Sequence, residues 1–207
     1  MSANRLAALL VTVLVLAASS LAQNNEISGT LGRIFVSSQD IQGAQFPNPH
    51  VHFGDGLSFS LNYGRLITRR GIFGFTGEVP FAANFDTDLN SGTNQVPEGY
   101  RAFFIAPSGR LNLFSGSAVS PWVSAGGGYG LFKMSGHAVY YGPNPGPTRT
   151  NTGVVQFGAG LDVWPWRHWG MRMEARDFWS GVPELNVDTG RSRQHNYYVG
   201  GGVIRRF

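Results

Sequence analysis

The stretch LSFSLNY, residues 57–63, alternates between apolar and polar side chains at every position. Its apolar members are Leu57, Phe59, Leu61 and Tyr63, and the residues between them are serine or asparagine. Successive side chains of a β-strand point to opposite faces, whereas a helix repeats every ~3.6 residues. The stretch therefore predicts a strand with one large apolar face and one small polar face.

The same alternation recurs in eight segments of the chain. They span residues 26–38, 56–67, 71–81, 99–114, 119–134, 152–163, 170–179 and 196–207. Three connections are short, 68–70, 115–118 and 164–169, and they alternate with four long ones of about 16 or 17 residues, 39–55, 82–98, 135–151 and 180–195. Loops of that length are uncommon in compact soluble domains, and here all four fall at the same end. The pattern predicts an all-β fold, an eight-stranded antiparallel up-and-down barrel.

The direction of the apolar face decides what surrounds such a barrel. The large apolar residues of these segments are Phe59, Tyr63, Phe73, Phe75, Phe157, Leu161, Met171 and Met173. An eight-stranded barrel has too little interior volume for all of them, so we expect them outside. A soluble barrel of lipocalin type, with the apolar face inside, is the alternative.

The opposite face carries glycine, serine, threonine and charged residues. The charged members are Glu78, Arg110, Asp162, Arg172, Glu174 and Arg176. Acids and bases are both present, so we expect them to pair as a network that fills the lumen. An apolar exterior then requires lipid, and the sequence predicts a transmembrane β-barrel, because only helices and closed barrels satisfy their backbone groups there.

The composition fits an exported membrane protein. Charged residues make up 14% of the chain, against about 25% in soluble proteins, and aromatic residues make up 13%. A net charge of +4, dispersed along the sequence, is too weak to indicate nucleic acid as a partner. The absence of cysteine excludes disulfides and thiolate metal sites. Without a third ligand nearby, we interpret His50 and His52 as polar loop residues, and we expect no metal and no cofactor.

The first residues have the pattern of a secretion signal. Arg5 precedes an apolar run of 13 residues from Leu6 to Ala18, and Ser20-Leu21-Ala22 follows as a small-x-small cleavage site. The run is shorter than the ~20 residues that span a bilayer. We therefore expect a signal peptide at 1–22 and an outer-membrane barrel domain at 23–207.

Four stretches resemble a known family: SPWVSAGGGYGLF at 120–132, GAGLDVW at 158–164, MRMEARDF at 171–178 and VGGGVIRRF at 199–207. In order and spacing they are similar to the eight-stranded outer-membrane barrels of the OmpA/OmpX type. The resemblance implies a location in the outer membrane of Gram-negative bacteria, with outer-membrane lipid around the barrel. Full-length OmpA proteins carry a periplasmic cell-wall-binding domain after the barrel, whereas this sequence stops at Phe207, so we expect a barrel that displays loops.

The resemblance also gives the last segment a role. A final strand ending in phenylalanine, with apolar residues at alternate positions, looks like the signal read by the outer-membrane assembly machinery. On that interpretation Phe207 is the recognition residue, and Tyr197, Val199 and Val203 continue its face.

We expect a structural and surface-interaction role rather than catalysis, with an unknown extracellular ligand at the four long loops. The alternative is a lipid A-modifying enzyme, because deacylases of this barrel size use His-x-Ser with a nearby glutamate. Here Ser135 and His137 occur in the reverse order, and Glu174 is expected inside the lumen. A small ion-permeable pore is a further alternative, if the lumen pairs rearrange.

Overall fold

The computed structural model describes residues 24–45, 47–93, 95–139 and 142–207, and the expected signal peptide lies outside them. Among the described residues, nine longer strands build the barrel wall: β1 (Asn25–Phe35), β4 (Leu57–Arg70), β5 (Phe73–Asn90), β6 (Gly99–Ile105), β7 (Ser108–Leu113), β8 (Val119–Met134), β11 (Arg149–Val163), β12 (Trp169–Gly181) and β14 (Tyr197–Arg206). Five short ones are β2 (Gln39–Asp40), β3 (His50–Phe53), β9 (His137–Ala138), β10 (Gly142–Pro143) and β13 (Arg193–Gln194), which pairs with the end of β12. None of the described residues forms a helix long and apolar enough to cross a membrane.

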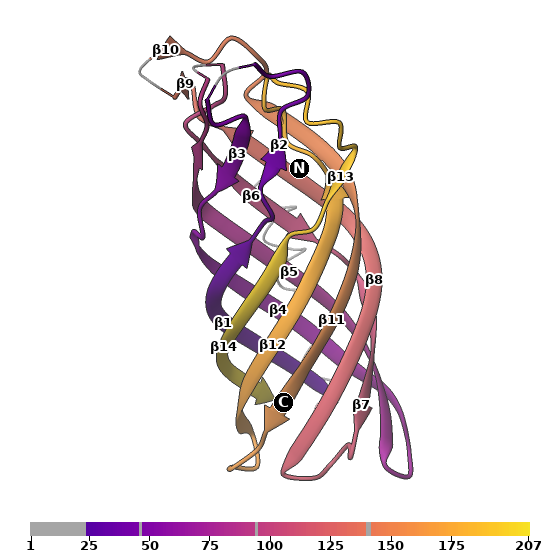
Figure 1. Cartoon of the computed structure of the whole chain (residues 1–207). Helices are drawn as coiled ribbons and strands as arrows, with labels where there is room; N and C mark the ends of the chain where they lie inside the picture. The colour runs from indigo at the N-terminus through magenta and orange to yellow at the C-terminus, as the bar shows by residue number, and fades with distance from the viewer. Residues whose placement is uncertain (1–23, 46, 94, 140–141) are drawn as a thin grey trace, which may run out of the picture.

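Eight antiparallel ring strands close into a barrel, as predicted (Figure 1). Their order around the ring is β1, β4, β5, β6 with β7, β8, β11, β12 and β14, and β14 pairs back onto β1. β6 and β7 form one ring strand, interrupted at Ala106 and Pro107, because both pair with β5 and with β8. Each ring strand that the structure describes thus has a neighbour on both sides, so the ring has no edge strand.

Several strand boundaries differ from the sequence prediction, and those of β5 and β4 show the physical reason. β5 continues to Asn90, although residues 82–98 were expected to be a loop. Its register shifts between Asn84 and Thr87, and such a bulge breaks the period-two signal that marks a strand. β4 likewise passes through the expected turn at 68–70, with a register shift between Leu66 and Thr68, and the chain turns at Gly71 and Ile72 instead. Gly71 has φ +58°, a conformation that glycine adopts without steric cost.

The long connections gather at one end of the barrel, the loop end, and the short ones at the other, the turn end (Figure 1). At the loop end the connections pack on one another instead of projecting separately. Val51, Leu89, Val96 and Leu185 are buried there, and residues from three connections form a common apolar core. A bridge between Pro97 and Ala138 joins two of these connections. The loop end is therefore a packed cap that continues the barrel.

Candidate functional site: the barrel interior

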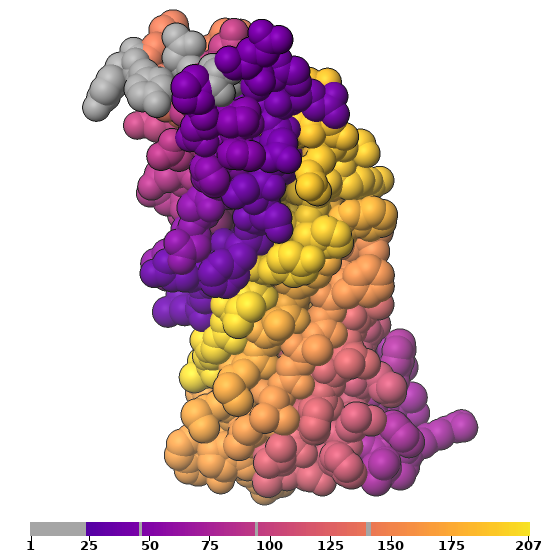
Figure 2. Space-filling view, viewed as in Figure 1, coloured from indigo at the N-terminus to yellow at the C-terminus, as the bar shows by residue number. Residues whose placement is uncertain are grey.

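The wall has the polarity predicted for a membrane protein. Phe157, Met171 and Met173 are 53–55% exposed on the outside, whereas Arg110, Arg172 and Arg176 are at most 2% exposed inside. In the space-filling view the side chains of β14, β12, β11 and β8 cover this part of the wall continuously (Figure 2). A soluble barrel has the opposite arrangement, so the lipocalin-type alternative is wrong for this fold.

All six charged residues predicted for the lumen come together in the half of the barrel nearer the turn end. Arg176 contacts Glu78 at 2.8 Å and Glu174 at 2.9 Å, and Arg110 contacts Glu78 at 3.1 Å. Arg172 contacts both carboxylate oxygens of Asp162 at 2.7 Å, a bidentate arrangement. We call these residues, with Glu26 and Arg206 described next, the ionic cluster.

Two members of the ionic cluster were missed from the sequence. Glu26 on β1 forms ion pairs with Arg110 and with Arg172, the latter at 3.2 Å, and Arg206 lies 3.8 Å away. With them the cluster contains four carboxylates and four guanidinium groups, so its formal charges balance. The alternation of Glu26, Ser28 and Thr30 with apolar or glycine neighbours was the available signal.

An inward tryptophan forms the centre of the ionic cluster. Trp122 on β8 is 2% exposed and donates its indole N–H to Asp162 at 3.2 Å. The guanidinium groups of Arg110, Arg172 and Arg176 lie 5.6, 5.2 and 5.0 Å from the centre of its ring. Cation–π contacts of this kind strengthen in a desolvated site. Small and charged side chains alone were expected in the lumen, so Trp122 corrects that expectation.

A second layer, nearer the loop end, is apolar. Phe104 stacks on Phe178 at 5.0 Å and meets Phe132 edge to face at 5.7 Å, and Tyr100 meets Phe132 at 5.6 Å. We call these four residues the aromatic layer; all are at most 3% exposed. This layer was not predicted, because the apolar residues were all assigned to the outside. The lumen is thus filled by charges at one level and by rings at the next.

The four residues expected to form the assembly signal share the outer face of β14 and its C-terminal end. Tyr197, Val199, Val203 and Phe207 are 43%, 52%, 55% and 37% exposed. The backbone of Phe207 is held by hydrogen bonds in both directions with Asn25, at 3.0 and 3.1 Å. The predicted apolar face is therefore present, and its recognition by a partner remains a prediction.

The residues considered for catalysis are not brought together. The backbone N–H of His137 donates to Ser135 Oγ at 3.1 Å, and Glu174 lies inside the barrel, bonded to Thr30 and Arg176. His50 and His52 lie side by side, with ring centres 5.9 Å apart. Their Nδ1 atoms contact Asp40 and Ser38 respectively. Within the described part of the chain, no group of three or more histidine and carboxylate residues is placed to hold a metal.

No protein-family model and no curated protein matches the chain. Solved structures do match its fold. The outer membrane protein OprG from Pseudomonas aeruginosa is 13% identical, with a TM-score of 0.55 over 90% of this chain and 97% of that one. The N-terminal β-barrel domain of Pseudomonas aeruginosa OprF is 12% identical, with a TM-score of 0.52 over 89% and 98%. Neisserial surface protein A is 12% identical, with a TM-score of 0.51 over 88% and 97%.

At these identities the likeness is one of fold. The closed ring, the apolar exterior and the charged interior define a transmembrane β-barrel. Within that class the chain has the fold of the small eight-stranded outer-membrane barrels, and the bacterial outer membrane is the location that this fold and this surface require.

Proposed function

We propose that the protein is a surface-interaction protein, in which a closed barrel anchors a packed loop cap at the cell surface. The observation that carries this proposal is the filling of the lumen at three successive levels. The ionic cluster, the aromatic layer and the apolar core of the loop cap follow one another along the barrel axis. At the mouth of the turn end, the hollow lined by Glu26 and Arg206 has a volume of ≈ 30 Å³, room for about one water molecule.

A filled lumen favours loop binding over transport. An ion-permeable pore would need the pairs of Arg176 and Arg172 to separate, and each pair is desolvated. Catalysis on lipid A has less support, because Ser135 and His137 do not form a hydrogen-bonded pair through their side chains and Glu174 is inside. The part left to interact is the loop cap, whose connections in the structure run over 36–56, 91–98, 135–148 and 182–196.

Two measurements on the full chain test this proposal. In planar bilayers we expect no sustained ion conductance. In cells that produce the protein we expect the mass spectrum of lipid A to be that of cells without it. Steady channels would favour the pore. A changed acyl pattern that disappears in Ser135→Ala or His137→Ala would favour the enzyme.

The orientation is testable because the chain contains no cysteine. Pro147→Cys places a thiol at the exposed loop end, and Ser117→Cys places one at the exposed turn end. On intact cells, a membrane-impermeant maleimide should label Pro147→Cys only, and both variants should react after lysis. Labelling of Ser117→Cys alone would contradict a loop cap at the cell surface.

We also propose that the outer face of β14, ending at Phe207, contacts the assembly machinery during insertion. Its exposure and its fixed backbone support this role.

A further inference from the structure

Three basic residues stand in register on neighbouring ring strands at the loop end. Arg101 on β6 is the cross-strand partner of Lys133 on β8, and Lys133 is in turn the partner of Arg149 on β11. All three are exposed and share the parity of the outer face. Directly opposite side chains on one face of an antiparallel pair have Cβ atoms about 4.5–5.5 Å apart. We call these three residues the cation row.

The cation row has no counter-charge at ion-pair distance. Among the residues that the structure describes, none of the three takes part in an ion pair. Like charges placed directly opposite each other destabilise a sheet. A ligand that carries negative charge would relieve this repulsion.

The level of the cation row along the barrel indicates where that ligand lies. One step toward the turn end on the same face, Phe103 pairs with Leu131, and one step further Ile105 pairs with Tyr129. The ammonium group of Lys133 lies 6.0 Å from the centre of the Phe103 ring. The cations therefore border the apolar belt, at the level where lipid headgroups meet the barrel.

A hollow of ≈ 480 Å³ adjoins the cation row, large enough for a ligand the size of a disaccharide. Arg101, Lys133 and Ser135 line it together with Asp86, Asp88 and Glu98. The hollow thus combines cations with carboxylates, which accept hydrogen bonds and bind no anion. A phosphorylated sugar suits this lining, because its phosphate accepts from the cations and its hydroxyl groups donate to the carboxylates.

We propose that the cation row and the adjoining hollow bind the phosphorylated sugar headgroup of a lipid in the outer leaflet. The phosphate contacts Arg101, Lys133 and Arg149, and the acyl chains lie along the apolar belt below. The ligand is a lipid component rather than a free anion, because the site borders the belt from outside.

The test uses the full chain refolded into phosphatidylcholine vesicles with and without diphosphoryl lipid A. The readout is the temperature at which the folded band converts to the unfolded band on a gel. We expect lipid A to raise this temperature. In the triple variant Arg101→Gln, Lys133→Gln, Arg149→Gln, at least half of the increase should be lost.

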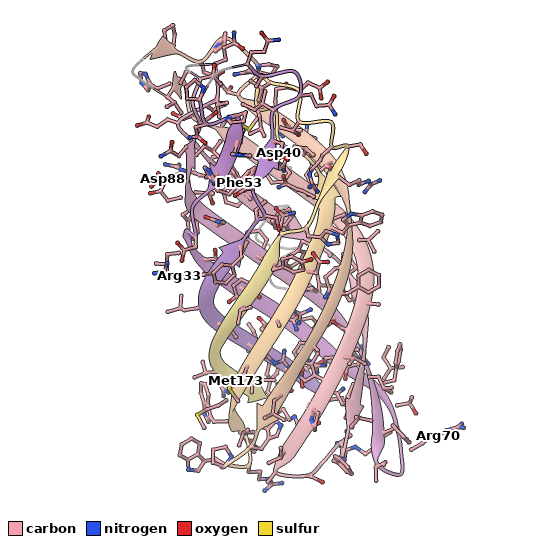
Figure 3. The ribbon with its side chains drawn as sticks, in the orientation of Figure 1. Arg33, Asp40, Phe53, Arg70, Asp88 and Met173 are labelled. Atoms are coloured by element: carbon pink, nitrogen blue, oxygen red, sulfur yellow. The ribbon has the colours of Figure 1, made fainter. Side chains whose placement is uncertain are left out.

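The matched control removes the same charge at the other rim. Arg65, Arg70 and Arg167 are exposed toward the turn end, and Figure 3 shows Arg70 at the opposite end of the molecule from Asp88. In the variant Arg65→Gln, Arg70→Gln, Arg167→Gln, lipid A should still raise the conversion temperature by the full amount. Equal loss in both triple variants would mean general charge attraction and would overturn the proposal.

Two further arms identify the chemical group. Dephosphorylated lipid A should give no increase, and inorganic phosphate added to plain vesicles should give none. A rise of the conversion temperature with dephosphorylated lipid A or with inorganic phosphate would overturn the proposal. So would an unchanged conversion temperature with diphosphoryl lipid A. If the triple variant does not fold, Lys133→Gln replaces it, because Lys133 is the middle residue of the cation row. If lipid A raises the conversion temperature of Lys133→Gln as much as that of the natural protein, the proposal is overturned.

Discussion

Arg176 Nη1 lies 2.8 Å from Glu78 Oε1, and this ion pair joins opposite walls of the barrel. Three ring strands separate β12 from β5 in either direction around the ring. Both side chains are fully buried, and Glu78 also pairs with Arg110 on β7. One carboxylate therefore ties three parts of the wall together across the lumen.

Removal of that carboxylate should destabilise the barrel strongly. Glu78→Ala leaves two buried guanidinium groups without a principal partner, and breaking a buried pair in this way costs about 3–5 kcal/mol. We expect the free energy of unfolding, measured by urea titration in lipid vesicles, to fall by about that amount. Asp55→Ala is the control, because the Asp55–Arg33 pair is more than half exposed on both sides and should change the value by less than about 1 kcal/mol. Equal effects of the two substitutions would contradict the cross-lumen role.

The second prediction concerns the wall residues that point toward lipid. Phe157 is 54% exposed halfway along β11, and arginine on the lipid face near the midplane costs about 2–4 kcal/mol. Phe157→Arg should lower the free energy of unfolding in vesicles by that amount. Trp166→Arg, in the connection between β11 and β12, should cost no more than about 1 kcal/mol, because the rim is near water. If the two substitutions lower the free energy of unfolding equally, the apolar belt does not lie at the level of Phe157.

Much of the fold was predictable because lipid on one side and a narrow lumen on the other force alternation on every ring strand. β8 begins and ends where its pattern does, at Val119 and Met134. The prediction was wrong where the alternation stops, as in β5, where Ala82 and Ala83 are adjacent and both buried before the bulge. A bulge interrupts the two-residue period, so the sequence pattern does not indicate a strand there.

The alternation along each strand assigned the six charged residues to the lumen. It did not predict which of them form ion pairs with one another. Whether Arg176 meets Glu78 depends on the stagger of strands across the ring, which local sequence does not encode. The aromatic layer was missed for another reason. In residues 99–105 large apolar side chains occur at both parities, with Tyr100 and Phe104 inside and Phe103 and Ile105 outside, so alternation gives no direction there.

The fit between Gly160 and Trp122 gives a third prediction. A methyl group added at Gly160 would collide with the backbone carbonyl oxygen of Met173 and with the ring of Trp122, whose Cε2 would lie 2.6 Å away, whereas one added at Gly29 would meet nothing within 4 Å. Gly160→Ala must displace both the indole at the centre of the ionic cluster and the neighbouring backbone of β12, and overpacking of this kind costs about 1–3 kcal/mol. Gly29→Ala should leave the unfolding midpoint in urea unchanged or slightly raised. A midpoint for Gly160→Ala equal to that of the natural protein would mean that Gly160 is not packed against Trp122 and the Met173 carbonyl group as the structure has it.

The last prediction concerns assembly and separates it from stability. Phe207 follows β14 on the outer face at the turn end of the barrel. Phe114, in the connection between β7 and β8, is an exposed aromatic residue at the same turn end. If the assembly machinery reads Phe207, then Phe207→Ala should reduce the heat-modifiable barrel in outer-membrane fractions severalfold, while Phe114→Ala should not. Both variants should refold into detergent as completely as the natural protein, because neither side chain is in the lumen. A loss of refolding in Phe207→Ala would assign its effect to stability, and normal membrane levels in cells would contradict its role as an assembly signal.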